Sequence, residues 1–205
     1  MSKLDDALKR RVKPGQLFEP ETLETKGYSL SEIKLDIKAA LGERRLVSFA
    51  YGIYYQPSKS GLKPSPLDAI KLRYIGNGDT AYGFFYGQFF IKDYLGQPFD
   101  DRQLIEVVTN KATSVKKAVY MFSRRFVIRR SYAPINAYNA DSLAFLAYLS
   151  SASDSEVEAN MSVLSTYIRD KHLSSDLLMK FSDKVPSKAY RRLYSTGLYR
   201  SLWKR

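Results

Sequence analysis

The sequence predicts an α+β fold made of two domains. Residues 1–57 show helix-type spacing of apolar residues and then two short β-like runs, while later segments mix strand patterns with a helical C-terminal region. A stretch rich in proline and serine separates the two parts. Hydrophobic residues make up 44% of the 205 residues and charged residues 26%, so there is enough apolar material for a core in each part.

The first part of the chain is predicted to begin with two short helices. Residues 3–11 place three apolar residues on one helical face, and Val12-Lys13-Pro14-Gly15 breaks the pattern. A second helix follows Phe18-Glu19-Pro20, because proline is favoured in the first turn, and Lys26-Gly27 ends it.

A third helix is expected to start at Ser29 or Ser31. Ser29 and Glu32 have the spacing of a capping box, in which a serine and an acidic residue satisfy the first free N–H groups of a helix. Apolar residues then recur at helical spacing and predict a buried stripe. The stripe consists of Leu30, Ile33, Ile37, Ala40 and Leu41.

Two short β-like runs, 46–49 and 53–56, come directly after this helix. Three helices followed by a small hairpin is the element order of a winged helix-turn-helix, whose third helix enters the major groove of DNA. Opposite the apolar stripe lie Ser31, Lys34, Asp36 and Lys38. A generic three-helix unit that only packs against the rest of the chain remains the alternative. The candidate DNA-binding residues are Ser29, Ser31, Lys34, Lys38, Arg44 and Arg45.

The domain boundary is predicted at residues 58–66, a linker by composition. Residues 1–57 then form the winged helix-turn-helix domain, and residues 67–205 form a second domain. Its α/β part is expected over 67–135 and its helical part over 139–205.

The second domain opens with a predicted helix over 67–74 and a turn over 75–79. Residues 80–94 are dense in aromatics, and their spacing predicts one buried helix in which Gly83 and Gly87 permit close packing. Residues 104–109 are a predicted core strand, and 118–122 with 125–130 a hairpin. Helices are expected at 140–150, 155–170, 174–183 and 187–204.

The net charge of +12 favours a polyanionic partner. The charge is spread evenly, since residues 1–63, 64–150 and 151–205 each carry +4. Two stretches lack acidic residues altogether, one between Glu106 and Asp141 and one after Asp183. The bland alternative is a solvated basic surface. The first stretch holds a candidate accessory basic surface made of Lys111, Lys116, Lys117, Arg124, Arg125, Arg129 and Arg130. The second holds Lys184, Lys188, Arg191, Arg192, Arg200, Lys204 and Arg205.

Composition argues against several other classes of protein. The chain has no cysteine and a single histidine, His172, so neither a disulfide framework nor a cysteine or multi-histidine metal site is expected. Without a long apolar run or a signal peptide, we expect a cytoplasmic protein that does not cross a membrane. No cofactor and no catalytic residue are predicted.

A metal-dependent nuclease is the enzymatic alternative. Asp100, Asp101 and Glu106 lie near a predicted strand, as in nucleases that hold a metal with carboxylates. Those enzymes also place a lysine two residues after the second carboxylate, where this chain has Val108, and Lys111 falls beyond the strand. The spacing therefore disfavours this chemistry.

Several segments resemble one protein family, and together they span nearly the whole chain. The run Leu46-Val47-Ser48-Phe49-Ala50-Tyr51-Gly52-Ile53-Tyr54-Tyr55 looks like the end of the winged helix in the AbiEi family. Leu95-Gly96-Gln97-Pro98, the strand from Ile105 to Lys111, and Arg124–Arg130 leading to Ala133-Pro134-Ile135 are similar to its second domain. Val185-Pro186-Ser187-Lys188-Ala189-Tyr190-Arg191-Arg192-Leu193 resembles its closing helix.

AbiEi proteins are the antitoxins of type IV toxin–antitoxin, or abortive-infection, systems. The resemblance implies a DNA-binding repressor of its own operon that binds inverted repeats in the promoter, cooperatively and from a monomer in solution. It also implies that the second domain counters a nucleotidyltransferase-like toxin without a tight complex. Family members often carry arginines in the wing, near the positions of Val47, Ser48 and Tyr51, where this chain has none. The second domain is therefore expected to supply part of the DNA-binding charge.

A third class of function stays open beside the repressor and the nuclease. A protein-interaction module could neutralise a toxin without binding an operator, and the uncharged wing favours this alternative.

Overall fold

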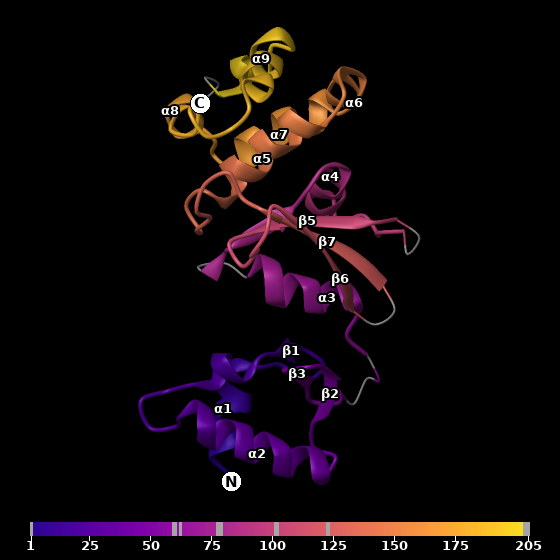
Figure 1. The fold of residues 1–205 in the computed structure, drawn as a ribbon, viewed down its shortest axis with the longest axis vertical. Coiled ribbons are helices and arrows are strands. Elements are labelled where there is room, and N and C mark those ends of the chain that lie inside the picture. Colours follow the sequence, from indigo (N-terminus) through magenta and orange to yellow (C-terminus); the bar gives the residue numbers. More distant parts are fainter. Residues whose placement is uncertain are drawn as a thin grey trace. The chain divides into compact units, whose positions relative to one another are not determined.

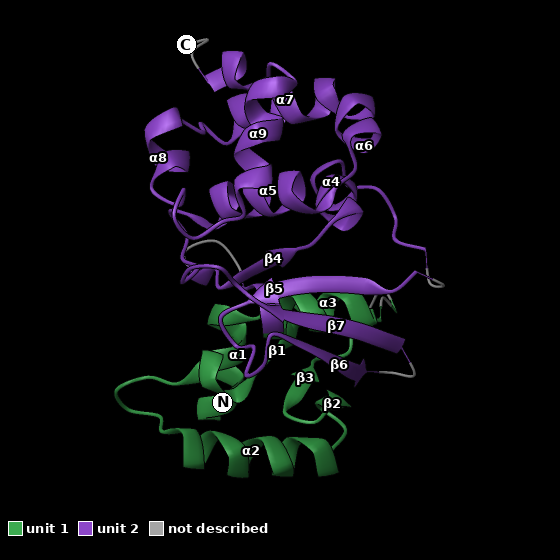
Figure 2. Cartoon of the chain, turned by 45° about the horizontal axis from the view of Figure 1, so that its top comes forward, with its two compact units in different colours: residues 1–73 green, residues 74–205 purple. Residues whose placement is uncertain are grey.

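The structure, a computed structural model, describes residues 2–58, 61, 63–76, 80–100, 103–121 and 124–202. These residues form two compact units, Met1–Arg73 and Tyr74–Arg205 (Figure 2). Each unit has its own small β-sheet and its own helices (Figure 1). The general α+β class predicted from the sequence is confirmed.

The first helix, α1, has the predicted bounds Lys3–Arg11. Ser2 caps it: its hydroxyl accepts a hydrogen bond from the Asp5 amide, and the Asp5 carboxylate accepts one from the Ser2 amide. Acidic residues in the first turn and basic residues in the last turn also suit the helix dipole. Leu4 and Leu8 are the residues that α1 buries.

The second predicted helix is wrong in part. Only a short 3-10 helix, η1 (Pro20–Leu23), forms there. It is preceded by strand β1 (Leu17–Phe18), whose residues pair with Tyr55 and Tyr54, so this part of the chain is extended. Thr25 and Tyr28 then form a β-bridge that closes the segment. Local spacing could not reveal β1, because its partner lies far along the chain.

Helix α2 (Leu30–Gly42) confirms the third predicted helix and its cap at Ser29. Strands β2 (Val47–Ala50) and β3 (Ile53–Tyr55) follow as an antiparallel pair, and the sheet has the order β1-β3-β2. One apolar core joins the helices to this sheet. Its buried members are Leu4, Leu8, Val12, Phe18, Leu23, Tyr28, Ile33, Ile37, Ala40 and Leu46.

The division between the units falls after Arg73, later than the predicted linker over 58–66. Ser65 caps helix α3 (Pro66–Ile70), which continues into the π-helical turn η2 (Lys71–Ile75). Arg73 belongs with the first unit because its Nε lies 2.9 Å from a Glu19 carboxylate oxygen and its Nη2 donates to the Tyr51 carbonyl. The helix predicted over 67–74 is thus present, but its end is bound to the N-terminal unit. Residues 59, 60 and 62 of the predicted linker lie outside the described part.

The second unit contains a mixed four-stranded sheet in the order β4-β5-β7-β6. The central strands β5 and β7 are parallel, and the two outer strands run antiparallel to their neighbours. The predicted strand over 104–109 and the predicted hairpin are therefore confirmed. The strands span Gly83–Phe85 (β4), Ile105–Thr109 (β5), Lys116–Met121 (β6) and Arg124–Arg130 (β7).

The single helix predicted over 80–94 is wrong in its first half. Residues 83–85 are β4, and only Gln88–Tyr94 form a helix, α4. Gly87 separates them with φ 63°, a left-handed conformation that other residues rarely adopt. A Cβ at Gly83 would lie 2.0 Å from the Tyr74 carbonyl oxygen. The glycine therefore allows the backbone at Tyr74 to approach strand β4 closely, and it does not serve helix packing as predicted.

The C-terminal region is helical, as predicted, but in shorter pieces. Asn160 divides the helix predicted over 155–170, and Gly197, with φ 78°, ends the last one. Both views place α5 between the sheet and the remaining C-terminal helices (Figures 1 and 2). The elements are α5 (Ala140–Ser151), α6 (Asp154–Ala159), α7 (Met161–Asp170), α8 (Ser175–Met179), α9 (Ser187–Ser195) and the 3-10 helix η4 (Leu198–Leu202).

Candidate nucleic-acid interface

The outer face of α2 carries the exposed side chains Ser31, Lys34, Leu35 and Lys38. Positions three and four apart on a helix are neighbours, so these four residues share one side. Within the described part of the chain, Lys34 and Lys38 form no ion pair. Leu35 is 68% exposed and was missed by sequence reasoning. Its position between the two lysines, outside the buried stripe, was the available signal.

Asp36, which the sequence placed on the same face, is directed elsewhere. The Tyr28 hydroxyl donates to its carboxylate at 2.6 Å. Tyr28 is buried, and burial together with this carboxylate raises the pKa of the phenol. Asp36 thus fastens α2 to the segment before it, and its charge lies apart from the two lysines.

Ser29 is occupied by the capping of α2. Its backbone N–H and its hydroxyl both donate to the Glu32 carboxylate, at 2.9 and 2.7 Å. These bonds, with a smaller contribution from Lys3, lower the pKa of Glu32 to about 2. Ser29 therefore fixes where α2 begins, and its part in any DNA contact is to position the first turn.

Arg45 differs from the prediction, because its charge is already compensated. Its guanidinium lies 2.6 Å from a Glu43 carboxylate oxygen and 2.8 Å from an Asp5 oxygen. The second bond ties the end of α2 to the start of α1. A phosphate would have to displace two carboxylates to bind this guanidinium. We therefore interpret Arg45 as a structural residue rather than a DNA ligand.

Arg44 has the opposite character. It is exposed, it forms no ion pair within the described residues, and it follows the end of α2 with φ 58°. A left-handed conformation is unfavourable for residues other than glycine, by about 1–2 kcal/mol. The chain thus keeps a cation at a position where glycine is the favoured residue.

Arg44→Gly is therefore expected to affect DNA affinity and thermal stability in different ways. Glycine adopts this conformation without strain, so the melting temperature should stay unchanged or rise slightly. If the α2 face binds DNA, affinity should fall, because an exposed cation close to that face is lost. Thermal unfolding and a gel shift measure the two effects. Unchanged DNA affinity in a folded Arg44→Gly protein would remove Arg44 from the interface.

The turn between β2 and β3 presents an aromatic residue instead of an arginine. Tyr51 is 96% exposed, and the next residue, Gly52, has φ 69°. Arg73 donates to the Tyr51 carbonyl at 2.7 Å and so holds the turn in place. Val47 is half-buried and Ser48 is exposed. The β2–β3 turn thus carries no charge of its own, and Arg73 holds its backbone in place.

Strand alternation divides the predicted accessory basic surface between two faces of the second sheet. The pairing register places Lys116, Arg125 and Arg129 on one face. Lys117, Arg124 and Arg130 lie on the opposite face, and Lys111 follows the end of β5. The seven residues therefore do not form a single surface, which corrects the prediction.

On the first face, Glu106 of β5 holds two of the cations. Arg129 forms an ion pair with one carboxylate oxygen, and Lys116 Nζ lies 3.4 Å from the other. The Arg129 guanidinium also stacks 4.6 Å from the centre of the Tyr86 ring. Arg125 is exposed and lies directly opposite Tyr120, which is 72% exposed. Sequence reasoning missed Tyr120, because the hairpin register that places it opposite Arg125 does not follow from alternation along one strand.

On the second face, two of the cations donate hydrogen bonds to backbone carbonyls. Arg124 donates to the Asp100 carbonyl at 2.8 Å, and Arg130 to the Thr113 carbonyl at 3.2 Å. Lys111 Nζ lies 4.2 Å from the centre of the Tyr82 ring. Lys117 is exposed. Arg124 and Arg130 thus stabilise loops, and Lys111 packs on an aromatic ring.

One carboxylate of the nuclease hypothesis already has cationic partners in the structure. Glu106 is engaged by Arg129 and Lys116, and Asp101 lies outside the described residues. Among the residues that the structure describes, no three metal-binding side chains are grouped to hold an ion. None of the helices in the described segments has the length and apolarity needed to cross a bilayer.

Comparison with known proteins does not assign the chain to a family. No family model matches the chain, and no curated protein matches it. Among solved structures, the chain is similar to the crystal structure of RV2827C protein from Mycobacterium tuberculosis. The two are 14% identical, with a TM-score of 0.47, over 98% of this chain and 76% of that one.

Proposed function

We propose that the chain is a DNA-binding antitoxin of a type IV toxin–antitoxin system. In this proposal the first unit is a winged helix that represses the protein's own operon, and the second unit counters a nucleotidyltransferase-like toxin. The protein acts in the cytoplasm, without catalysis and without a cofactor. The observation that carries the DNA-binding half is the exposed face of α2, where Lys34 and Lys38 flank Leu35.

The proposed contacts follow from the chemistry of that face. Lysine side chains reach base edges and phosphates in the major groove, and an apolar side chain can contact the methyl group of thymine. Arg44, at the end of α2, is proposed to bind a phosphate. The β2–β3 turn takes the role of the wing, with Tyr51 at its tip. The protein is proposed to bind inverted repeats cooperatively, as a monomer that assembles on DNA.

Binding to the DNA upstream of the protein's own gene is expected to weaken steeply as salt rises. Each phosphate contact adds about −0.9 to the slope of log K against log salt, so two or three contacts per protomer predict a slope of about −2 to −3. A gel shift at several salt concentrations measures this slope. A control fragment of equal length and shuffled sequence separates operator recognition from general polyanion binding. Equal affinity for both fragments would contradict the repressor proposal.

The antitoxin half is tested with a fragment that begins at Ser65, which caps α3. Residues 65–205 are expected to protect cells from the cognate toxin, because they contain the whole second unit. They should no longer repress a promoter reporter, because α2 is absent. Circular dichroism of the purified fragment verifies that it is folded. A folded fragment that gives no protection would refute the assignment of toxin neutralisation to this half.

One observation favours the second candidate, an interaction module without operator binding. The β2–β3 turn carries no cation, and Arg45 is compensated by two carboxylates. This candidate predicts protection from the toxin together with no gel shift on any part of the upstream region. The metal nuclease, the remaining alternative, is tested by incubating the protein with DNA and Mg²⁺.

A further inference from the structure

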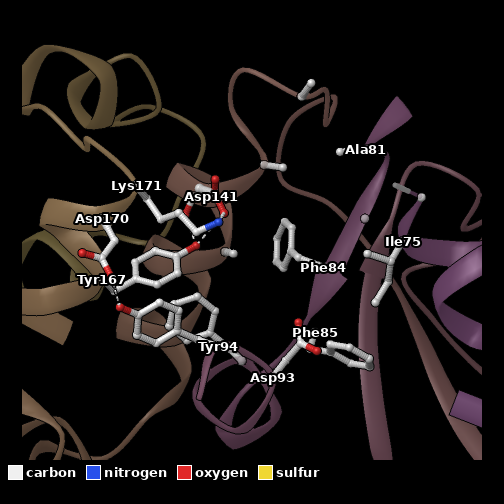
Figure 3. Close-up of a pocket in the computed structure, with 16 residues that line it drawn as sticks. Ile75, Ala81, Phe84, Phe85, Asp93, Tyr94, Asp141, Tyr167, Asp170 and Lys171 are labelled. Atoms are coloured by element: carbon white, nitrogen blue, oxygen red, sulfur yellow. Dashed lines mark hydrogen bonds and ion pairs between the residues drawn. The ribbon is translucent and has the colours of Figure 1, made fainter. Parts of the chain in front are cut away.

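The second unit contains a cleft of about 900 Å³ between β4 and helices α4, α5 and α7 (Figure 3). Volumes of roughly 300–1,000 Å³ are typical of ligand sites. None of the residues considered for DNA binding lines it. The cleft therefore needs an explanation of its own.

Aromatic side chains form much of the cleft wall. The rings of Tyr94 and Tyr167 pack edge to face with their centres 4.9 Å apart, and Phe90 packs 4.7 Å from Tyr167. In Figure 3 the Phe84 ring lies across the hollow from the two tyrosines. Faces of aromatic rings attract cations.

The charges of the cleft are mainly negative, although the chain as a whole carries +12. Among the described residues, Asp93, Asp141 and Asp170 line it together with one cation, Lys171. The Tyr94 hydroxyl donates to Asp170 at 2.6 Å, and the Tyr167 hydroxyl donates to Asp141 at 2.9 Å. The two tyrosines thus connect these carboxylates and hold them at the aromatic wall. Lys171 Nζ lies 3.5 Å from Asp141 and marks where an ammonium group is accommodated.

We propose that this cleft binds an organic cation, an alkylammonium or guanidinium group held between the aromatic wall and the carboxylates. Such a ligand places its charge beside Asp170 and its carbon chain against the Phe84 and Tyr94 rings. An anionic ligand such as a nucleic-acid phosphate is disfavoured by the same carboxylates. The site is separate from the α2 face, so it stands whether or not the chain binds an operator.

Two sources share this chemistry, a free polyamine and a basic side chain of a partner protein. Calorimetry with spermidine tests the first, and calorimetry with an acetylated, amidated peptide containing one arginine tests the second. Both titrations use the full-length protein without DNA, at about 0.15 M salt, where weak surface attraction is screened. Binding of either probe at one site per chain is expected. Heat from neither probe at millimolar concentration would overturn the proposal.

Charge variants inside and outside the cleft decide whether the site is the one described. Asp170→Asn keeps the shape and the Tyr94 contact but should weaken binding about tenfold, whereas exposed Asp183→Asn should not. Lys171→Gln removes the competing cation and should strengthen binding, whereas exposed Lys180→Gln should not. If each cleft variant behaves like its control, the binding is general charge attraction and the proposal fails. Circular dichroism of all four proteins verifies their folding.

Discussion

Replacing both Lys34 and Lys38 by alanine is expected to weaken operator binding by about 1–3 kcal/mol for each lysine that reads a base. Both side chains are exposed on one face of α2, and alanine is a strong helix former, so the helix itself should be retained. A loss of affinity would therefore report a DNA contact made by these two side chains. A gel shift with the upstream DNA, at one fixed salt concentration, measures the change.

The matched control replaces Lys9 and Lys13 by alanine. These lysines are exposed in the same unit but lie outside α2, so the change in net charge is identical. The control should lose only the affinity that comes from the general field of the protein. If the α2 variant binds the operator as tightly as the control, α2 is not the reading helix.

Leu35→Ala extends this test from affinity to sequence preference. Loss of an apolar contact with a thymine methyl group should relax discrimination at one base pair and leave the salt slope unchanged. A panel of operators with single base substitutions measures this discrimination.

The positions of α1 and α2 could be predicted from sequence because local patterns determine them. A serine followed three residues later by an acidic residue begins α1, α2, α3 and α6 as a capping box in the structure. The predicted bounds of α1 rested on the spacing of Leu4, Ala7 and Leu8 and on the break at Val12-Lys13-Pro14-Gly15. Strands β5 and β7 were recognisable from short β-branched runs for the same reason.

The errors arose where the partner of a residue is distant in sequence. Residues 83–85 form a strand because they pair with 107–109, and aromatic spacing alone could not show this. Arg44 and Arg45 are adjacent and chemically alike, yet only Arg45 meets Asp5, which is 40 residues away. The cleft could not be foreseen either, since Asp93, Asp141 and Asp170 come from separate elements.

The acid-free stretch after Asp183 contains two adjacent arginines with different roles, one exposed and one buried in contacts between helices. Arg191 and Arg192 both count toward a basic surface in the sequence, but α9 exposes the first and leaves the second only 7% exposed. Arg192 Nε lies 2.6 Å from an Asp154 oxygen in the first turn of α6. Its Nη1 donates at 2.8 Å to the Leu149 carbonyl near the end of α5. One guanidinium thus joins three helices.

Arg192→Met is therefore expected to destabilise the second unit by about 2–4 kcal/mol, since the Leu149 carbonyl loses its donor and the charge-assisted bond to Asp154 disappears. Arg191→Met removes the same charge from the surface and should change the unfolding free energy by no more than about 0.5 kcal/mol. Urea unfolding of residues 65–205, followed by circular dichroism, measures both. Arg192→Lys should lie between them, because an ammonium cannot reproduce the two directed bonds of the guanidinium. Equal stability of the two methionine variants would show that the packing of α5, α6 and α9 does not depend on Arg192.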